Sequence, residues 1–170
     1  VMKNIAKMEK KTGKKWNSIK NPLLVSVRSG AATSMPGMMD TILNLGLNEK
    51  TVEGLAEQTK NPRFSWDSYR RFIQLFGKVV FGINDEKFDH VLDTVKEKQG
   101  ITDDSKLNVE SLKTIVLQYK KICEEHTKRK FPNTPDEQLV LSIEAVFKSW
   151  MGERAIVYRE KNNITKDIAN

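Results

Sequence analysis

The stretch SVRSGAATSMPGMMDTILNLGL, residues 26–47, determines how this chain begins to fold. Two short apolar runs, 22–29 and 40–47, flank its central part, and each is typical of a buried strand. The loop between them consists mostly of Gly, Ala, Ser, Thr and Met, and Arg28 stands at its entrance. The sequence therefore predicts a strand–loop–strand unit with one positive charge at the start of the loop.

The composition of this loop suits the binding of an anion. Small side chains let backbone N–H groups come close to a ligand, and glycine allows the positive φ angles that turn successive N–H groups to one side. An arginine beside them adds a planar fork of donors that fits phosphate oxygens. Met35, Met38 and Met39 can pack on a flat apolar ring or hold the loop against the core, and Asp40 can orient an arginine or start a turn.

The residues alone leave the role of the loop open. Its sequence matches neither the P-loop pattern nor the glycine pattern of dinucleotide-binding turns. Two interpretations remain: a loop that binds phosphates, or a structural hairpin loop whose glycines only turn the chain.

From Asn48 onward, apolar residues recur at helical spacing, which predicts that the rest of the chain is helical. Helix starts are predicted at the cap residues Asn48, Asn84, Asn108 and Thr134. Buried stripes are expected on two long helices, one made of Trp66, Tyr69, Phe72, Ile73, Phe76, Val79 and Val80, and one of Leu139, Val140, Ile143, Val146, Phe147 and Trp150.

The predicted fold class is α+β and mostly helical. We expect a strand–loop–strand part at 1–47, a helical subdomain at 48–130 and helices that return to the first part at 131–170. Two strands alone make a marginally stable sheet. The chain is therefore expected to be a fragment, which supplies part of a sheet that other segments complete.

The bulk composition limits the environment and the partners. No apolar run approaches the roughly 18 residues that a membrane span requires, and a single cysteine, Cys123, excludes an internal disulfide. A formal net charge of +7 and a pI near 9.4 favour anionic partners such as phosphates or nucleic acid. The N-terminus lacks an apolar signal segment, so a cytoplasmic or organellar location is expected.

The positive charge leaves two alternatives, a basic helical module that binds nucleic acid or one that docks another protein. The charges are scattered over several predicted elements, and the aromatic residues lie on an apolar face rather than on a stacking platform, which argues against nucleic acid. The two histidines, His90 and His126, lack partners at metal-ligand spacing, so no metal site is expected within the chain.

Four motifs resemble the ATP-grasp nucleotide-binding domain of the pyruvate, phosphate dikinase family. They are VSVRSGAATSMPGMMDTILNLGLN, NPRFSWDSYRRFIQLFG, FPNTPDEQLVLSIEAVFKSW and RAIVYR. The motifs stand in the family's order and spacing, and the resemblance extends over about residues 9–165. It implies that the chain is the central part of such a domain.

The resemblance also implies roles for particular residues. Arg28 matches the arginine that contacts the nucleotide phosphates, and Arg71 matches an arginine of the ATP and inorganic phosphate site, so both are candidate catalytic residues. Arg71 lies off the apolar stripe of its helix and is free to point at an anion. The loop that folds over the phosphates corresponds to Ser34, Met35, Pro36, Gly37, Met38, Met39, Asp40 and Thr41.

In that family, ATP, pyruvate and inorganic phosphate are converted reversibly to AMP, phosphoenolpyruvate and diphosphate through a phosphohistidine. The resemblance implies Mg²⁺ and ATP as cofactors of a parent enzyme, a homodimer that also carries phosphohistidine and pyruvate-binding domains. The family's upstream glycine-rich lysine segment and downstream acidic metal ligands have no counterpart in these 170 residues. We therefore expect the isolated chain to be inactive and to bind ATP weakly or not at all.

Overall fold

The computed structural model describes residues 1–30, 35 and 37–164. Strands β1 (Val25–Arg28) and β2 (Thr41–Leu45) pair antiparallel in a two-stranded sheet. Arg28 at the end of β1 pairs with Thr41 at the start of β2. The predicted strand–loop–strand unit is therefore confirmed, and the loop leaves and re-enters the sheet at adjacent positions.

The helices are α1 (Met2–Thr12), α2 (Glu49–Thr59), α3 (Pro62–Phe81), α4 (Asp85–Gln99), α5 (Val109–Thr127), α6 (Pro135–Ser149) and α7 (Glu153–Lys161), with a 3₁₀ turn η1 (Asp104–Lys106). Helices α2, α4, α5 and α6 begin at the predicted cap residues. The side chains of Asn48, Asn84, Asn108 and Thr134 each accept a hydrogen bond from a backbone N–H of the following turn. The predicted α+β, mostly helical class is confirmed.

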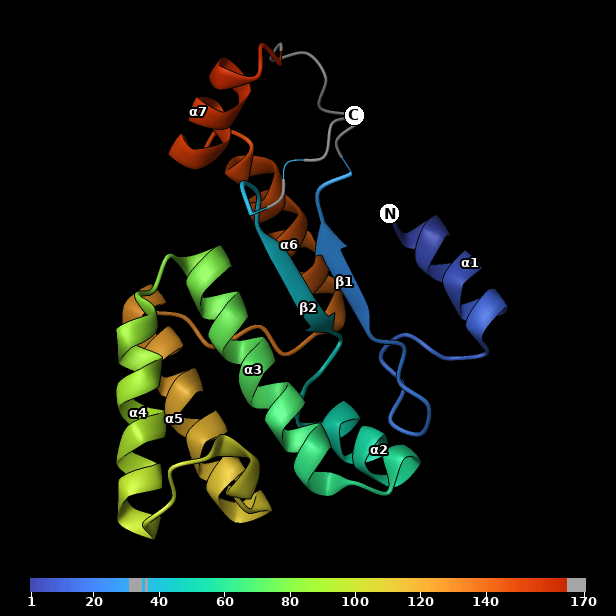
Figure 1. Ribbon diagram of the computed structural model, residues 1–170. Coiled ribbons are helices and arrows are strands. Elements are labelled where there is room, and N and C mark those ends of the chain that lie inside the picture. Colours follow the sequence, from blue (N-terminus) through green and yellow to red (C-terminus); the bar gives the residue numbers. More distant parts are fainter. Residues whose placement is uncertain (31–34, 36, 165–170) are drawn as a thin grey trace.

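Helix α3 is the centre of the arrangement. It packs against α2, α5 and β2, while α6 packs on both strands. Figure 1 shows α6 behind the sheet, α4 and α5 on the far side of α3, and α7 at the end of the sheet where the loop emerges. Among the described residues, no helix is both long and apolar enough to cross a membrane.

The main core contains a cluster of aromatic rings along α3. Tyr69, Phe72 and Phe76 are almost fully buried, as the sequence predicts. Phe76 and Phe131 make an edge-to-face pair with ring centroids 5.4 Å apart. Val79 and Val80, by contrast, are only half-buried, because they pack against the core on one side and line a pocket on the other.

The predicted buried stripe of α6 is partly wrong. Leu139, Val146 and Trp150 are buried, but Val140 and Phe147 are 56% and 66% exposed. Their apolar character made them part of the expected stripe, yet the buried face of the helix is turned away from them.

Gln138 accounts for this orientation of α6. Its side chain is fully buried, and its Nε2 donates to the backbone oxygens of Leu47 at 2.9 Å and Pro132 at 3.1 Å. Its Oε1 accepts from the N–H of Gly46 at 3.0 Å. A buried amide with three hydrogen bonds fixes which face of α6 meets the end of β2. A prediction from apolar periodicity places a polar residue such as Gln138 on the exposed face of the helix.

Stability is expected to fall at alkaline pH because three acidic side chains, those of Tyr69, Tyr119 and Cys123, are buried in their neutral form, and burial raises the pKa of each. Burial raises the pKa of the Cys123 thiol from 9.0 to about 12, and that of Tyr119 from 10.0 to about 12. Below pH 9 both groups are protonated in the folded and the unfolded chain. Between pH 9 and about 12 the unfolded chain loses protons that the folded chain retains, so unfolding becomes easier.

The expected decrease is about 1 kcal/mol per pH unit for each group. Urea unfolding followed by tryptophan fluorescence at pH 7, 9 and 10.5 measures it. Cys123→Ala should unfold more readily at pH 7 but show a shallower alkaline decrease. An equal slope in the variant would contradict the assignment to this thiol.

Candidate phosphate-binding site

The candidate site is the loop that joins β1 to β2, called here the phosphate loop (residues 29–40). Its two ends are held together because Arg28 and Thr41 are paired in the sheet. The Arg28 side chain is exposed at the loop entrance. Two of the predicted site residues, Ser34 and Pro36, lie outside the described residues.

The second half of the phosphate loop contains a tight turn. The N–H of Met38 donates to the backbone oxygen of Met35 at 3.1 Å, and Gly37 has a φ of 72°. A positive φ at the third position of a four-residue turn is the mark of a type II turn, in which glycine is strongly favoured. Gly37 therefore has a conformational role whether or not the loop binds a ligand.

Met39 and Asp40 connect the loop to the rest of the molecule. Met39 is half-buried and packs against the main core, which agrees with the hypothesis that a methionine holds the loop down. The N–H of Asp40 donates to the Ser149 hydroxyl at the end of α6, at 3.2 Å. The end of the loop is thus held by contacts outside the sheet.

Arg154 at the start of α7 is a site residue that sequence reasoning missed. Its Nη2 lies 3.6 Å from Oδ1 of Asp40, and its Nη1 donates to the backbone oxygen of Gly37 at 3.4 Å. The only signal in the sequence is its place in the RAIVYR motif, because 117 residues separate it from Gly37. The phosphate loop consequently has a second arginine beside it, in addition to Arg28.

Arg71 stands on α3, off the apolar stripe, and its side chain is 62% exposed. Its Nε donates to Oδ2 of Asp67 at 3.0 Å. That this arginine binds an anion stays a prediction. Its two Nη groups make no hydrogen bond with any residue that the structure describes, so they remain accessible to an anion.

Arg70, the neighbour of Arg71, is structural. Its side chain is 4% exposed, and its Nε and Nη2 donate to Oδ1 of Asp67 at 2.9 and 2.7 Å. Burial lowers the pKa of Arg70, but the hydrogen bond and the charge of Asp67 outweigh this and leave the pKa raised. Asp67 thus contacts the buried Arg70 through Oδ1 and the exposed Arg71 through Oδ2.

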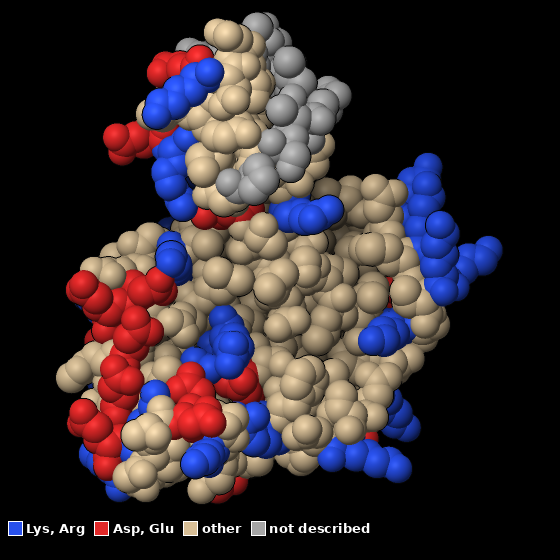
Figure 2. Space-filling model, viewed as in Figure 1, with Lys and Arg blue, Asp and Glu red and all other residues tan. Residues whose placement is uncertain are grey.

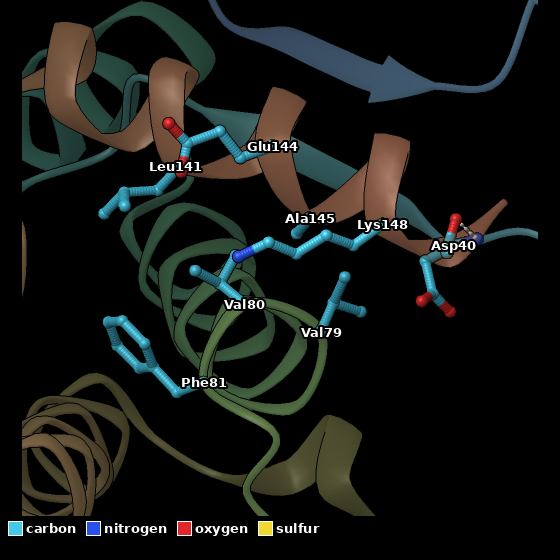
Figure 3. Close-up of a pocket in the computed structure, with 9 residues that line it drawn as sticks. Asp40, Val79, Val80, Phe81, Leu141, Glu144, Ala145 and Lys148 are labelled. Carbon is cyan, nitrogen blue, oxygen red and sulfur yellow. Dashed lines mark hydrogen bonds between the residues drawn. The ribbon is translucent and has the colours of Figure 1, made fainter. Parts of the chain in front are cut away.

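A pocket of about 340 Å³ lies beside the phosphate loop, between the end of α3 and α6. Asp40 and Ser149 stand at one side of it, and the remaining lining is Val79, Val80, Phe81, Leu141, Glu144, Ala145 and Lys148. Figure 3 shows the Lys148 side chain extending from α6 across the pocket toward Val80. Apolar and polar groups share its lining almost evenly, and Glu144 and Lys148 bring opposite charges to it.

On the face that Figure 2 shows, basic and acidic side chains gather at opposite edges. In Figure 2, acidic residues gather over α4, whereas Lys and Arg form a cluster over α1 at the opposite edge. Between them, the face over the strands and α3 is largely uncharged. Within the described part of the chain, no group of three or more His, Cys, Asp or Glu side chains is arranged to hold a metal ion.

The paired strand–loop–strand unit, the mostly helical remainder and the packing of α6 on both strands agree with part of an ATP-grasp nucleotide-binding domain. The family described as "Pyruvate phosphate dikinase, AMP/ATP-binding domain" matches residues 1–169. The chain belongs to this family.

Curated relatives agree with this assignment. The chain is 54% identical over 168 residues to a pyruvate, phosphate dikinase of Giardia intestinalis, covering 99% of the chain and 19% of the relative. Identity is 52% over 170 residues for the enzyme of Entamoeba histolytica and 47% over 168 residues for that of Clostridium symbiosum, again with 19% of the relative covered. The chain thus spans about a fifth of the length of these proteins.

Proposed function

We propose that this chain is the phosphate-binding part of the nucleotide-binding domain of a pyruvate, phosphate dikinase. Arg28 contacts the phosphates of ATP, and residues Ser34 to Thr41 fold over them. Arg71 supplies charge to the ATP and inorganic phosphate site through its free Nη groups. The observation that carries the proposal is the pairing of Arg28 with Thr41, which places an exposed guanidinium at the mouth of the loop.

The proposed reaction requires little covalent chemistry from these residues. The parent enzyme transfers the β-phosphoryl group of ATP to a histidine of another domain and the γ-phosphoryl group to inorganic phosphate. Phosphoryl transfer depends mainly on positioning and on stabilisation of charge on the transferred oxygens. Arginine forks and backbone N–H groups supply both, because they are fixed donors that match phosphate geometry.

The chain supplies only part of what the reaction requires. We propose the division already suggested by the sequence, with 48–130 as a helical subdomain and 131–170 returning to the strands. Catalysis would then depend on phosphohistidine and pyruvate-binding domains elsewhere in a homodimeric parent, in the cytoplasm or an organelle. We propose that Mg²⁺ is held by the nucleotide phosphates together with few carboxylates of the parent enzyme, as is usual for this ion.

Removal of Arg28 is expected to weaken ATP binding about tenfold or more in the complete nucleotide-binding domain. A charge-assisted hydrogen bond from a guanidinium to phosphate is worth about 1.5–3 kcal/mol. Calorimetric titration of ATP into the complete domain and its Arg28→Ala variant measures the change. The 170-residue chain alone should bind weakly or not at all.

Arg129→Ala is the matched control, because Arg129 is exposed near the end of α5 and its guanidinium makes no hydrogen bond or ion pair with the described residues. It removes the same charge without touching the loop. Equal losses of ATP affinity in both variants would mean that only the net charge of the domain matters. Tight binding that Arg28→Ala leaves unchanged would make the loop structural and place the nucleotide elsewhere.

A further inference from the structure

The corner between α6 and α7 reaches the phosphate loop at two points. Ser149, the last residue of α6, contacts the backbone of Asp40, and Arg154, in the first turn of α7, contacts Gly37 and the Asp40 carboxylate. Figure 1 shows this corner at the end of the sheet from which the loop emerges. We propose that Ser149 and Arg154 are positioning residues that hold the phosphate loop in the geometry that binds nucleotide phosphates. This inference rests on the proposed function of the loop.

The hydrogen bonds of Ser149 have a fixed direction. Its hydroxyl donates to the backbone oxygen of Val146, one turn earlier in α6, at 2.7 Å. Because the single hydroxyl proton is used there, the lone pairs of the oxygen are left to accept the Asp40 N–H at 3.2 Å. The last residue of the loop before β2 is therefore tied to the helix through a chain of two hydrogen bonds.

Arg154 adds a link across the turn of the loop. Its two Nη groups reach the Gly37 backbone oxygen at 3.4 Å and the Asp40 carboxylate at 3.6 Å. These contacts span the turn that closes at Met38 and the point where the loop enters β2. The side chain is 69% exposed, so each contact is weak, and an exposed pair of this kind changes an equilibrium only about two- to fivefold. Its contribution is to orient the loop rather than to stabilise the fold.

The corner itself is held rigidly. Arg159 in α7 is 2% exposed, and its Nη1 donates to the backbone oxygen of Trp150 at 2.5 Å. Its guanidinium carbon lies 4.2 Å from the centroid of the Trp150 ring, a cation–π contact. Since Trp150 directly follows Ser149, this contact fixes α7 against the end of α6. A fixed corner is what allows Ser149 and Arg154 to position a loop.

The test uses the longer protein that contains this chain, with two measurements on each variant. Calorimetry gives the Kd for ATP, and thermal unfolding without nucleotide gives the midpoint. Ser149→Ala is expected to raise the Kd about tenfold, because the Asp40 N–H loses its acceptor. Its unfolding midpoint should stay near that of the unmodified protein. Ser149→Thr keeps the hydroxyl and should restore the Kd.

Ser142→Ala is the matched control, because Ser142 lies on the same helix, is fully buried and has a hydroxyl without a hydrogen-bond partner among the described residues. Its Kd should be unchanged. Arg154→Gln should raise the Kd about two- to fivefold without changing the midpoint.

The two proposals fail in different ways. If the unmodified protein does not bind ATP, the proposed function fails and this inference falls with it. If the unmodified protein binds ATP and Ser149→Ala binds it equally well, only the positioning role is overturned. A lowered midpoint with an unchanged Kd would make Ser149 purely structural and would also overturn it.

Discussion

Replacing Asp67 by alanine is expected to lower the free energy of unfolding by about 3 kcal/mol. The variant leaves Arg70 as a buried charge that has lost its principal partner, and breaking a buried ion pair in this way costs about 3–5 kcal/mol. Asp104 lies 3.7 Å from Nη2 of Arg70 and is partly exposed, so it retains some of the compensation. We therefore expect a loss at the lower end of this range of about 3–5 kcal/mol. Urea unfolding at neutral pH measures it.

Arg71→Ala is the natural comparison, because Arg71 is bound to the same carboxylate from an exposed position. Its loss should change stability by less than about 1 kcal/mol. If Arg71 serves the phosphate site, the same variant should impair ATP-dependent activity of the parent enzyme. A large stability loss from Arg71→Ala, or a negligible one from Asp67→Ala, would contradict the distinction between the two arginines.

The difference between these two arginines illustrates what the sequence cannot reveal. Both are close neighbours of Asp67 on a helix, at i+3 and i+4, where either can form an ion pair. Their exposure depends on segments that come later in the chain: Arg70 lies beside Asp104 of η1 and Tyr119 of α5 and is 4% exposed, whereas Arg71 is 62% exposed. Local spacing predicted that Arg71 lies off the apolar stripe. It did not reveal that Arg71 shares a carboxylate with its buried neighbour.

Local signals did predict the elements themselves. The Asn48 side chain caps a helix through hydrogen bonds within one turn, so the start of α2 could be predicted from the sequence. The broad apolar stripe of α3 likewise determines which face of that helix is buried. The orientation of α6 could not, because it depends on hydrogen bonds between Gln138 and backbone groups about 90 residues earlier in the chain. The link from Arg154 to the phosphate loop has the same long-range character. The position of Arg28 at the start of the phosphate loop was therefore predictable from the sequence. The contacts that α6 and α7 make with this loop were not.

Replacing Gly54 by alanine is expected to destabilise the fold by more than about 3 kcal/mol, the upper end of the usual cost of overpacking. Gly54 is buried in α2, where the backbone of Ile19 crosses it. An added Cβ would coincide with the carbonyl oxygen of Ile19 and would lie 2.5 Å from its carbonyl carbon. These are backbone atoms, so no side-chain rotation can relieve the overlap, and the segment between α1 and β1 would have to move.

The direction of the stability change in Gly54→Ala is informative, because helix propensity alone predicts that this variant is stabilised. Alanine is favoured over glycine inside a helix by about 1 kcal/mol, so an unobstructed position would be stabilised. Gly30→Ala is the control, because no atom of the described residues lies within 4 Å of the position of its added Cβ. Urea unfolding of both variants should give a large loss for Gly54→Ala and almost none for Gly30→Ala. Stabilisation by Gly54→Ala would mean that Ile19 does not cross α2 closely, and the connection from α1 to the phosphate-loop strands would then follow another path.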